Sequence, residues 1–397
     1  MSQGYRLVED ADLGGRNTFG VPARAALLAE VLDTEALPEL LLHPGFRNGP
    51  ALVLGGGSNL LFAGDVDGTV LALRSQRIAI SAERDGDAIV RADAGVDWDA
   101  CVRWTLAQGL CGLENLALIP GTVGAAPIQN IGAYGVEVGD RIEAVEAWDL
   151  SSGQLRRLVP RDCAFAYRDS RFKHEPGRWI VTAVEFSLSR SPVLRLDYVG
   201  IADELAAMGV VSPDAVQVAE AVTRIRRRKL PDPAVIGNAG SVFKNPIVAA
   251  AVADALHTDH PKMPIYPVSP FPAAAILGAT TPDSAIPGRA SLTGRSKPQR
   301  AMPAERASSP TDAALHDEPG TGGRRKLSAA WLIDACGWKG HRDGDAGVSA
   351  EHALVLVNHG KATGPQLLDL ARRIAASVDA RFDVALESEP RIIGAEW

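Results

Sequence analysis

The sequence has few cysteines and no long hydrophobic run. No stretch approaches the ~18 consecutive apolar residues of a transmembrane helix, and residues 1–13 lack the basic start and apolar run of a secretory signal. The four cysteines, Cys101, Cys111, Cys163 and Cys336, are far apart and form no C-x-x-C pair. This spacing argues against a zinc knuckle and against a disulfide framework. We therefore expect a cytoplasmic protein with reduced thiols.

Positive charge is also limited. The 41 lysines and arginines are outnumbered by 48 aspartates and glutamates, which gives a formal net charge of -7. Such a chain has no overall field that attracts nucleic acid or an anionic membrane. An anionic ligand must therefore be bound by a few local cations. His257 and His260 have no cysteine nearby, and the sequence predicts no metal site.

The length and composition are typical of a globular protein with more than one domain. The chain has 397 residues, of which 46% are hydrophobic and 22% charged, and this predicts two or three domains. Apolar periodicity predicts a mixed α and β fold. The expected helices are residues 98–108, 213–229 and 366–382, the second with Ser212 as its N-cap. The expected strands are residues 51–54, 60–62, 69–73, 88–92, 142–148, 179–188, 193–198, 353–357 and 384–386.

Two segments lack clear periodicity. Residues 114–138 contain Gly121, Gly124, Gly132 and Gly135 in an apolar background, a composition that is poor for a helix and for a strand. It indicates a backbone that lies close against another group. The second segment, residues 268–325, contains eight prolines and many small residues. We expect a long flexible insertion there.

Two glycine-rich loops are candidates for a cofactor site. Gly55-Gly-Gly-Ser-Asn59 separates two expected strands, and exposed N–H groups in such a loop can hold phosphate oxygens. Residues 120–135 permit close packing on a flat group, and Gln129 and Asn130 can supply hydrogen bonds. A structural turn explains either loop when it is taken alone. The two together favour a cofactor that carries phosphate groups.

Two further motifs have more than one interpretation. Arg168, in Tyr167-Arg-Asp-Ser170, can present its guanidinium to a carboxylate or form a surface ion pair. Ser241 follows a glycine in a turn, where a serine can donate a proton or cap an element. From these residues alone, we favour a surface ion pair for Arg168, and capping is the commonest role of a serine such as Ser241.

Charged residues also cluster at the end of the chain and at the end of the second helix. Alternation along an expected strand places Glu387, Glu389 and Arg391 on one face, which is compatible with a solvated surface. The basic run at residues 226–229 lies at a helix C-terminus, where cations complement the helix dipole. We interpret this run as a helix end rather than as a nucleic-acid site.

Read in order, these segments resemble the UDP-N-acetylenolpyruvoylglucosamine reductases, flavoenzymes that complete UDP-N-acetylmuramate for bacterial peptidoglycan. The resemblance covers nearly everything outside residues 268–325. Several of the matching strings are long and specific, which makes chance similarity a poor explanation. The strings are residues 17–20, 55–59, 113–121, 129–135, 167–170, 229–233, 240–246 and 330–334, followed by Glu389.

The resemblance implies a fold class of α+β type. A two-subdomain FAD-binding half of p-cresol methylhydroxylase type precedes an α+β substrate-binding domain. By this resemblance, residues 1–78 and 79–228 form the two FAD-binding subdomains. Residues 229–383 form the substrate-binding domain, which contains the 268–325 insertion. Residues 384–397 carry a strand that returns to the FAD-binding half.

The resemblance also implies site residues. The expected catalytic residues are Ser241 as proton donor, with Arg168 and Glu389 stabilising an enediolate. The expected FAD contacts are Gly55, Gly56, Gly57, Ser58, Asn59, Pro120, Gly121, Gly124, Ala125, Gln129, Asn130, Gly132 and Tyr134. The expected substrate contacts are Tyr167, Tyr198, Lys229, Asn245, Tyr266 and Lys326.

The implied activity is reduction of an enolpyruvyl group by NADPH through FAD, in a monomeric enzyme. An FAD-dependent sugar or alcohol oxidase on the same scaffold and a nucleotide-sugar-binding protein without turnover are the alternatives. The three matched catalytic positions argue against both. Three departures from the family pattern remain: the long insertion, Ala125 in place of a small hydroxyl residue, and Pro390, which removes a backbone donor next to Glu389.

Overall fold

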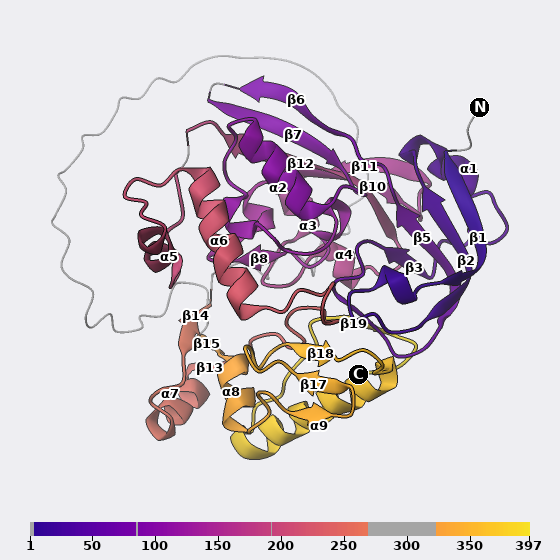
Figure 1. Ribbon diagram of the computed structural model, residues 1–397. Helices are drawn as coiled ribbons and strands as arrows, with labels where there is room; N and C mark the ends of the chain where they lie inside the picture. Colours follow the sequence, from indigo (N-terminus) through magenta and orange to yellow (C-terminus); the bar gives the residue numbers. More distant parts are fainter. Residues whose placement is uncertain (1–3, 85, 192, 269–322) are drawn as a thin grey trace, which may run out of the picture.

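The computed structural model describes residues 4–84, 86–191, 193–268 and 323–397. An N-terminal half, drawn in indigo to pink, packs against a C-terminal half drawn in orange and yellow (Figure 1). The expected insertion, residues 268–325, lies mostly outside the described residues. At its C-terminal end, residues 324 and 325 belong to a strand.

The first sheet is built from the N-terminal strands in the order β1-β2-β5-β3. These strands are β1 (Tyr5–Asp12), β2 (Arg24–Val31), β3 (Leu52–Leu54) and β5 (Val66–Leu73). β1 is antiparallel to β2, whereas β2 and β3 are both parallel to β5. Helix α1 (Leu37–Leu40) packs on this sheet, since Leu37 and Leu40 share a buried cluster with Ala29 and Leu71. β3 is an edge strand, and the glycine loop at residues 55–59 follows it directly.

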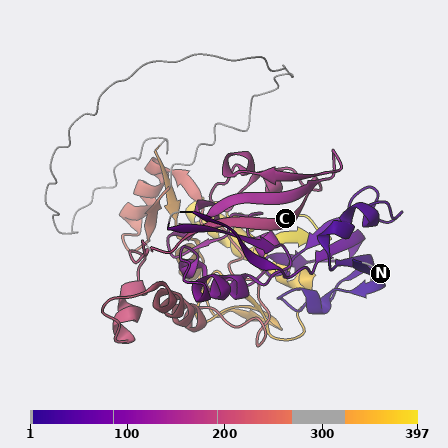
Figure 2. The same ribbon diagram turned by 90° about the horizontal axis from the view of Figure 1, so that it is seen from above.

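The second sheet is antiparallel throughout and has the order β11-β10-β12-β7-β6. Its strands are β6 (Ile78–Arg84), β7 (Asp87–Asp93), β10 (Ile142–Asp149), β11 (Gln154–Leu158) and β12 (Trp179–Ser189). Helices α2 (Trp98–Ala107) and α6 (Ala215–Lys229) pack on it, because Val102 and Val222 share a buried cluster with Val90 and Val184. Figure 2 shows the first sheet on one side of this second sheet.

Smaller elements complete the N-terminal half. They are α3 (Pro160–Cys163), α4 (Arg171–His174), α5 (Ile201–Ala207) and the hairpin of β8 (Gly132–Ala133) and β9 (Val136–Glu137). Apart from this hairpin, residues 114–138 form turns and single 3-10 turns, as expected for a segment without helix or strand periodicity.

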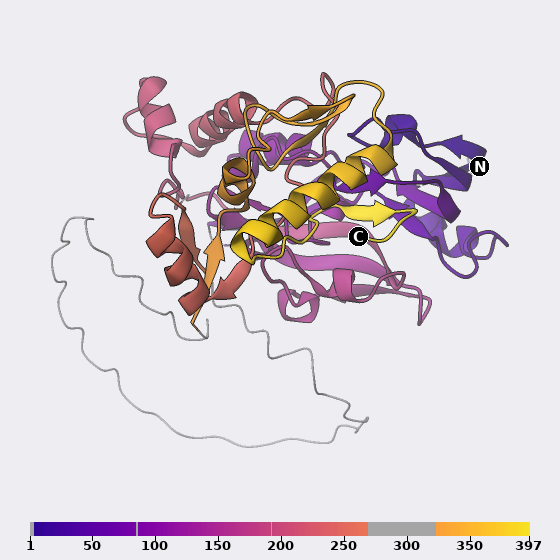
Figure 3. The ribbon, with the colours of Figure 1, turned by 90° about the horizontal axis from the view of Figure 1, so that it is seen from below.

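Outside residues 269–322, the C-terminal half contains two small sheets, β13-β15-β14 and β16-β17-β18, and three helices. The long helix α9 crosses this half (Figure 3) and buries Leu367, Ala371, Ile374 and Val378, the stripe that its periodicity predicts. The elements are β13 (Ile247–Ala249), α7 (Ala250–Asp259), β14 (Ile265–Pro267), β15 (Arg324–Leu327), α8 (Ala329–Ala335), β16 (Arg342–Asp343), β17 (Ala346–Val348), β18 (Leu356–Asn358) and α9 (Gly364–Phe382).

The chain returns to the N-terminal half near its end. β19 (Arg391–Ile393) pairs in parallel with β4 (Leu60–Phe62), which follows the first glycine loop. None of the helices in the described ranges has the length and apolar character needed to cross a lipid bilayer.

Two predictions in the N-terminal half are wrong. Residues 193–198 form no strand, and their extended backbone is held partly by a side chain, since Asn115 Nδ2 donates to the carbonyl of Arg195 at 2.9 Å. The second long helix begins at Ala215, because Asp214 rather than Ser212 is its N-cap. The Asp214 carboxylate accepts a hydrogen bond from the backbone N–H of Gln217 at 2.7 Å.

Two predictions near the C-terminus are also wrong. The strand expected at 353–357 is displaced, since residues 353 and 354 lie in a turn and β18 begins at Leu356. Residues 384–386 are not a strand, and Val384 and Leu386 are buried by packing instead. As a result, Glu387 and Glu389 do not share a face: Glu387 is exposed beside Lys244, whereas the Glu389 side chain is only 11% exposed.

Candidate active site

The two glycine-rich loops meet and form one wall of the site. A Cβ atom at Gly56 would lie 2.9 Å from the Cα of Gly121, so only glycine lets these backbones approach so closely. Asn59 Nδ2 donates to Gln129 Oε1 at 2.6 Å and joins the same loops through their side chains. The loop after β3 and the loop before β8 are thereby fixed against each other.

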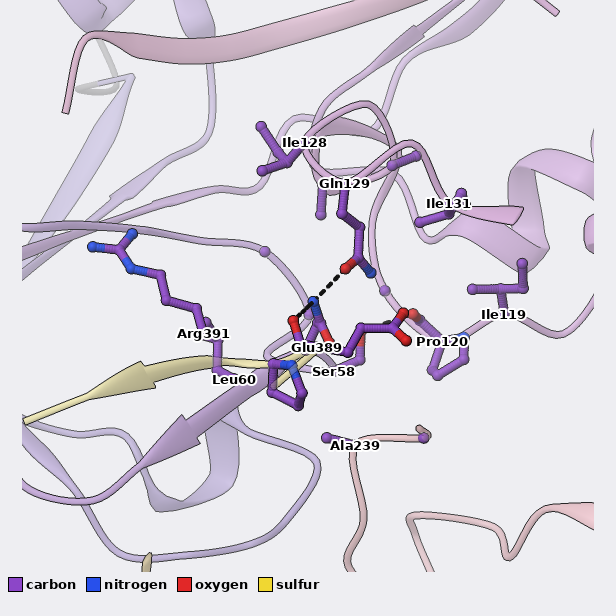
Figure 4. A pocket seen from close by; sticks show the side chains of 18 of the residues that line it. Ser58, Leu60, Ile119, Pro120, Ile128, Gln129, Ile131, Ala239, Glu389 and Arg391 are labelled. Carbon is purple, nitrogen blue, oxygen red and sulfur yellow. Dashed lines mark hydrogen bonds between the residues drawn. The ribbon is translucent and has the colours of Figure 1, made fainter. Parts of the chain in front are cut away.

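This wall borders a cavity of about 580 Å³ that residues from both halves of the chain line. Figure 4 shows Gln129 and Glu389 inside the cavity, with Ile119 and Ile131 toward one side and Arg391 toward the other. A smaller cavity of about 240 Å³ shares several lining residues with the first. The two are neighbouring compartments of one cleft.

The cleft fits a large, flat, anionic cofactor. Its walls combine glycine backbone with apolar side chains such as Ile119 and Ile131. The cleft is also lined by five cations, Arg168, Lys173, Arg226, Lys244 and Arg391. Glycine walls accept a flat ring, and cations with backbone N–H groups accept phosphates. The described residues contain no group of three His, Cys, Asp or Glu side chains that could hold a metal ion.

Arg168 and Glu389 are 221 positions apart in the sequence and form an ion pair in the cleft. Arg168 Nε donates to Glu389 Oε1 at 2.8 Å, and Arg168 Nη2 donates to the carbonyl of Gly132, also at 2.8 Å. Their side chains are only 19% and 11% exposed. The guanidinium is therefore held in one orientation with part of its edge facing the cavity.

The electrostatics of this pair favour a permanently charged arginine. Burial has the largest single effect on Arg168 and opposes its protonation, but the Glu389 carboxylate, together with Tyr167 and Glu137, raises the Arg168 pKa above its ordinary value. A second carboxyl group, Glu137, lies nearby, and burial raises its pKa against the opposing effect of Arg168. Burial lowers the pKa of Lys326, whose charge also acts on Glu137.

Ser241 lines the same cavity as Arg168 and Glu389. It follows Gly240, whose φ of +69° turns the backbone, and it forms a β-bridge with Val355. The backbone N–H of Glu389 donates to the carbonyl of Val242 at 2.8 Å. The serine loop and the glutamate segment are therefore joined next to the two side chains.

Three of the predicted substrate residues gather around the ring of Tyr167. The Lys326 ammonium lies 4.4 Å from the ring centroid and the Arg168 guanidinium 5.4 Å from it. Asn245 hydrogen-bonds to Tyr167, and Asn245 Oδ1 also accepts from the backbone N–H of Ala329 at 3.0 Å. Lys326 is opposite Tyr266 in the β14–β15 pair, which places a second predicted tyrosine next to this group.

Other predicted residues do not line the cavity. The side chain of Asn130 is buried and binds Glu137, the carbonyl of Ala166 and the N–H of Gly139. Tyr134 packs edge to face on Tyr198, with ring centroids 5.2 Å apart.

Lys229 lies exposed at the end of α6, so it too lies outside the cavity lining. The remaining predicted FAD contacts border one of the two compartments: Gly55, Gly56, Gly57, Ser58, Asn59, Pro120, Gly121, Gly124, Ala125, Gln129 and Gly132.

Sequence reasoning missed three cations that line the larger compartment: Lys173, Lys244 and Arg226. For Arg226 a signal was present, because it lies four positions after the buried Val222 and so shares the inner side of α6. Lys173 and Lys244 had no such signal, since their orientation depends on loops that only the tertiary structure arranges.

The fold and the cleft define a flavoprotein. Residues 25–158 match the family described as FAD binding domain, and this match confirms FAD as the predicted cofactor. Residues 232–393 match the family described as UDP-N-acetylenolpyruvoylglucosamine reductase, C-terminal domain. The predicted fold class, an FAD-binding half of p-cresol methylhydroxylase type followed by an α+β domain, is confirmed.

The chain belongs to the UDP-N-acetylenolpyruvoylglucosamine reductase family. It is 52% identical over 394 residues to the reductase of Xanthomonas euvesicatoria pv. vesicatoria, covering 99% of this chain and 98% of the relative. It is 47% identical over 388 residues to the reductase of Xylella fastidiosa, covering 98% and 96%. A crystal structure of the Thermus caldophilus reductase is similar with a TM-score of 0.58 and 24% identity over 98% of both chains, which shows the shared fold.

Proposed function

We propose that this chain reduces the enolpyruvyl group of UDP-N-acetylenolpyruvoylglucosamine with NADPH and produces UDP-N-acetylmuramate for peptidoglycan, in the cytoplasm and as a monomer. The observation that carries the proposal is that Arg168, Glu389 and Ser241 line the cavity that the glycine loops border. The name of the relatives supports the same reaction.

The chain's own residues provide a place for the cofactor. FAD, when bound, supplies the hydride for the substrate. The backbone of residues 55–57 and Gly121 offers a flat wall with N–H groups, and Asn59 and Gln129 add polar side chains at the centre of the cleft. Asn130 supports this wall from behind, through its buried hydrogen bonds.

Arg168 would stabilise the negative charge that develops on the substrate carboxylate. Hydride addition to the terminal carbon of the C=C bond leaves an enediolate, and a charged donor fixed in advance stabilises such a species more than it stabilises the ground state. Glu389 holds the guanidinium in place by its 2.8 Å bond to Nε. A fixed Arg168 needs little reorganisation when the charge appears.

Ser241 would then protonate the carbon next to the carboxylate. A serine hydroxyl is a weak acid, so it can donate its proton only to a strong base such as an enediolate. Ser241 lines the same cavity as the glycine loops, and its neighbour Val242 is hydrogen-bonded to the Glu389 backbone, which supports this assignment. The product is the saturated lactyl ether.

Substrate binding is assigned to the residues around Tyr167 and at the outer end of α6. Tyr167, Asn245 and Lys326 form one group beside Arg168. Tyr198 and Tyr266 are 47% and 40% exposed, Lys229 is exposed as well, and we assign all three to the nucleotide diphosphate. Lysines and tyrosine hydroxyls both donate hydrogen bonds to phosphate oxygens.

The proposed domain division follows the predicted boundaries. Residues 1–78 and 79–228 contain the first and second sheets with their helices, and residues 229–383 contain the two small sheets and α9. Residues 384–397 include β19, which pairs with β4 of the first unit. The glycine loops and the serine loop thus come from different proposed domains.

The experiment that tests the proposal is an anaerobic visible spectrum of the purified protein. The flavin band is expected to bleach after addition of NADPH and to return only after addition of the enolpyruvyl UDP-sugar. A band that returns with oxygen and ignores the sugar would favour an oxidase instead. Absence of a flavin band after incubation with FAD would favour a nucleotide-sugar-binding protein.

A further inference from the structure

Arg226 lies in the last turn of α6 and lines the larger compartment of the cleft. Its Nε donates to the carbonyl of Leu118 at 3.2 Å. Among the described residues, no other hydrogen bond and no ion pair of its guanidinium is found. Arg224 and Arg228 of the same helix, in contrast, each pair with a glutamate.

The surroundings of Arg226 compensate only part of the cost of its charge. Burial lowers its pKa, Tyr134 and Asp99 act in the opposite sense, and Arg168 adds a like charge. Asp99 is already engaged by Arg103 and by the N–H of Leu118, at 2.7 and 2.6 Å. Arg226 is half-buried, and a guanidinium that is largely withdrawn from water without an acidic partner is unfavourable, so the site favours a bound group that carries negative charge.

Arg226 belongs to one end of the cleft. It lines the larger compartment together with Ala239 and Ser241, and it does not line the smaller one. Lys173 and Arg391 line both compartments and therefore lie where these join. The charge of Arg226 therefore lies in the compartment that Arg168 and Ser241 also line, and the charge of Arg168 acts on it.

We propose that Arg226 raises the reduction potential of the bound flavin by stabilising the negative charge that the ring gains when it is reduced. The inference rests on the proposed FAD-dependent reduction. A cation acts strongly on a neighbouring charge where water is excluded, and charges near the ring are a recognised means by which proteins tune a flavin. By thermodynamic linkage, Arg226 then also makes the protein bind reduced flavin more tightly than oxidised flavin.

The test compares the midpoint potential of the holoprotein in four forms: wild type, Arg226→Gln, Arg226→Lys and Arg227→Gln. Arg227 is the exposed neighbour on the same helix and controls for the loss of one positive charge. Each form is reduced anaerobically beside a reference dye. We expect Arg226→Gln to reduce the equilibrium constant for flavin reduction at least tenfold, which is about 30 mV for a two-electron couple. The equilibrium constant for flavin reduction should fall less in Arg226→Lys than in Arg226→Gln, and it should fall less than twofold in Arg227→Gln.

Dissociation constants of oxidised and reduced FAD are measured for the same variants. A weakening confined to reduced FAD supports the proposal. Equal weakening of oxidised and reduced FAD binding, with an unchanged midpoint potential, would show that Arg226 binds the diphosphate and would overturn the proposal. An equal change of the midpoint potential in Arg227→Gln would also overturn it. If Arg226→Gln does not fold, Arg226→Met, which also removes the charge, takes its place in the comparison. Failure of the wild type to bind FAD contradicts the proposed function itself.

Discussion

Arg168 has a backbone conformation that is uncommon for a residue with a Cβ atom, with φ at +53°. Ala166 and Asp169 exchange two backbone hydrogen bonds around it, each 3.0 Å long. Lys173 Nζ donates to the Arg168 carbonyl, and Asn130 Nδ2 donates to the Ala166 carbonyl, also at 3.0 Å. Surroundings of this kind sustain backbone strain, and they present the guanidinium to Glu389 with little freedom to move.

Ser241→Ala separates the two half-reactions. We expect reduction of the flavin by NADPH to stay within about twofold of wild type, because this step needs no proton from Ser241. Oxidation of the flavin by the enolpyruvyl sugar should slow about 100- to 10,000-fold, the usual effect of a general acid. Stopped-flow absorbance of the flavin measures both steps.

Ser388→Ala is the matched control for this prediction. Ser388 also lines the cavity, but its Oγ donates to the carbonyl of Pro390 at 2.9 Å and has no proposed role in the reaction. Similar losses in both half-reactions of Ser241→Ala, or the same loss in Ser388→Ala, would remove Ser241 from the proton-donor role.

Asn130→Ala should affect stability more than flavin binding. The substitution leaves the N–H of Gly139 without its partner and removes one hydrogen bond each from the carbonyl of Ala166 and the Glu137 carboxyl. We expect the free energy of unfolding to fall by about 2 to 3 kcal/mol, because buried polar groups lose their hydrogen bonds. Urea unfolding measures this change. An unchanged stability with a large loss of FAD affinity would indicate direct cofactor contact.

At the scale of single elements, the start of α6 depends on a side chain that the sequence pattern did not single out. Asp214 accepts from the N–H of Gln217, and Gln217 Oε1 accepts from the N–H of Asp214 at 3.0 Å. Asp214→Ala should lower the free energy of unfolding by about 1 kcal/mol, the usual effect of removing an N-cap. Ser212→Ala should change it by less than about 0.5 kcal/mol. Urea unfolding measures both changes. A larger loss of stability in Ser212→Ala than in Asp214→Ala would indicate that Ser212 is the N-cap.

The turn between β10 and β11 predicts a pH dependence. Asp149 accepts from Arg178 at 3.2 Å and from Ser151 Oγ at 2.6 Å. The Arg178 hydrogen bond lowers the Asp149 pKa in the folded state, although burial opposes it. A carboxyl whose folded pKa is below its unfolded pKa stabilises the protein above the unfolded value and loses this effect as the pH falls.

We therefore expect Asp149→Asn to be about 1 kcal/mol less stable than wild type at pH 7. The difference should shrink as the pH falls below about 4, the ordinary aspartate pKa. Urea unfolding at several pH values measures it, with Asp67→Asn as the control, since Asp67 is exposed. A difference that stays constant with pH would contradict the role of the charged form.

At the scale of the whole molecule, the two halves share one core. A single buried cluster contains Leu28 of the first sheet and Phe62 of β4 together with Phe243 and Leu367 from the C-terminal half. Asn358 Nδ2 also donates to the carbonyl of Phe19 at 2.9 Å. Because apolar burial continues across the boundary, we expect the two halves to unfold together in the same transition.

Replacement of residues 269–322 by a short glycine-serine linker should preserve the fold. β14 and β15, which flank this segment, are antiparallel neighbours with Pro267 opposite Arg325, so a short turn can join them. Loop-closure entropy depends only weakly on length, and a shorter loop costs less. The ratio of flavin absorbance to protein absorbance and the Tm should match wild type within experimental scatter. Insoluble or flavin-free protein would show that the segment supports the fold.

The elements that were predicted well have strong periodicity and local stop signals. α9 and α2 follow their apolar stripes, and the edges of β4 and β10 are within one residue of the expected positions. The weaker predictions concern short apolar runs such as residues 193–198 and 384–386. In these segments the apolar residues alternate with others because their side chains pack on neighbouring side chains. In the described part of the chain, neither segment pairs with another strand. Short-range patterns do not contain that information.

The sequence alone determined the glycine loops, the long helices, the cofactor class and the family, because each depends on residue types at fixed local spacing. Only the tertiary structure decided that Arg168 meets Glu389 across 221 positions, and that the Asn130 side chain turns away from the cavity. It also decided that Arg226 faces the cavity while Arg227 is exposed. The physical reason is that contacts between distant segments follow from how buried surfaces pack together, and packing is a property of the whole chain.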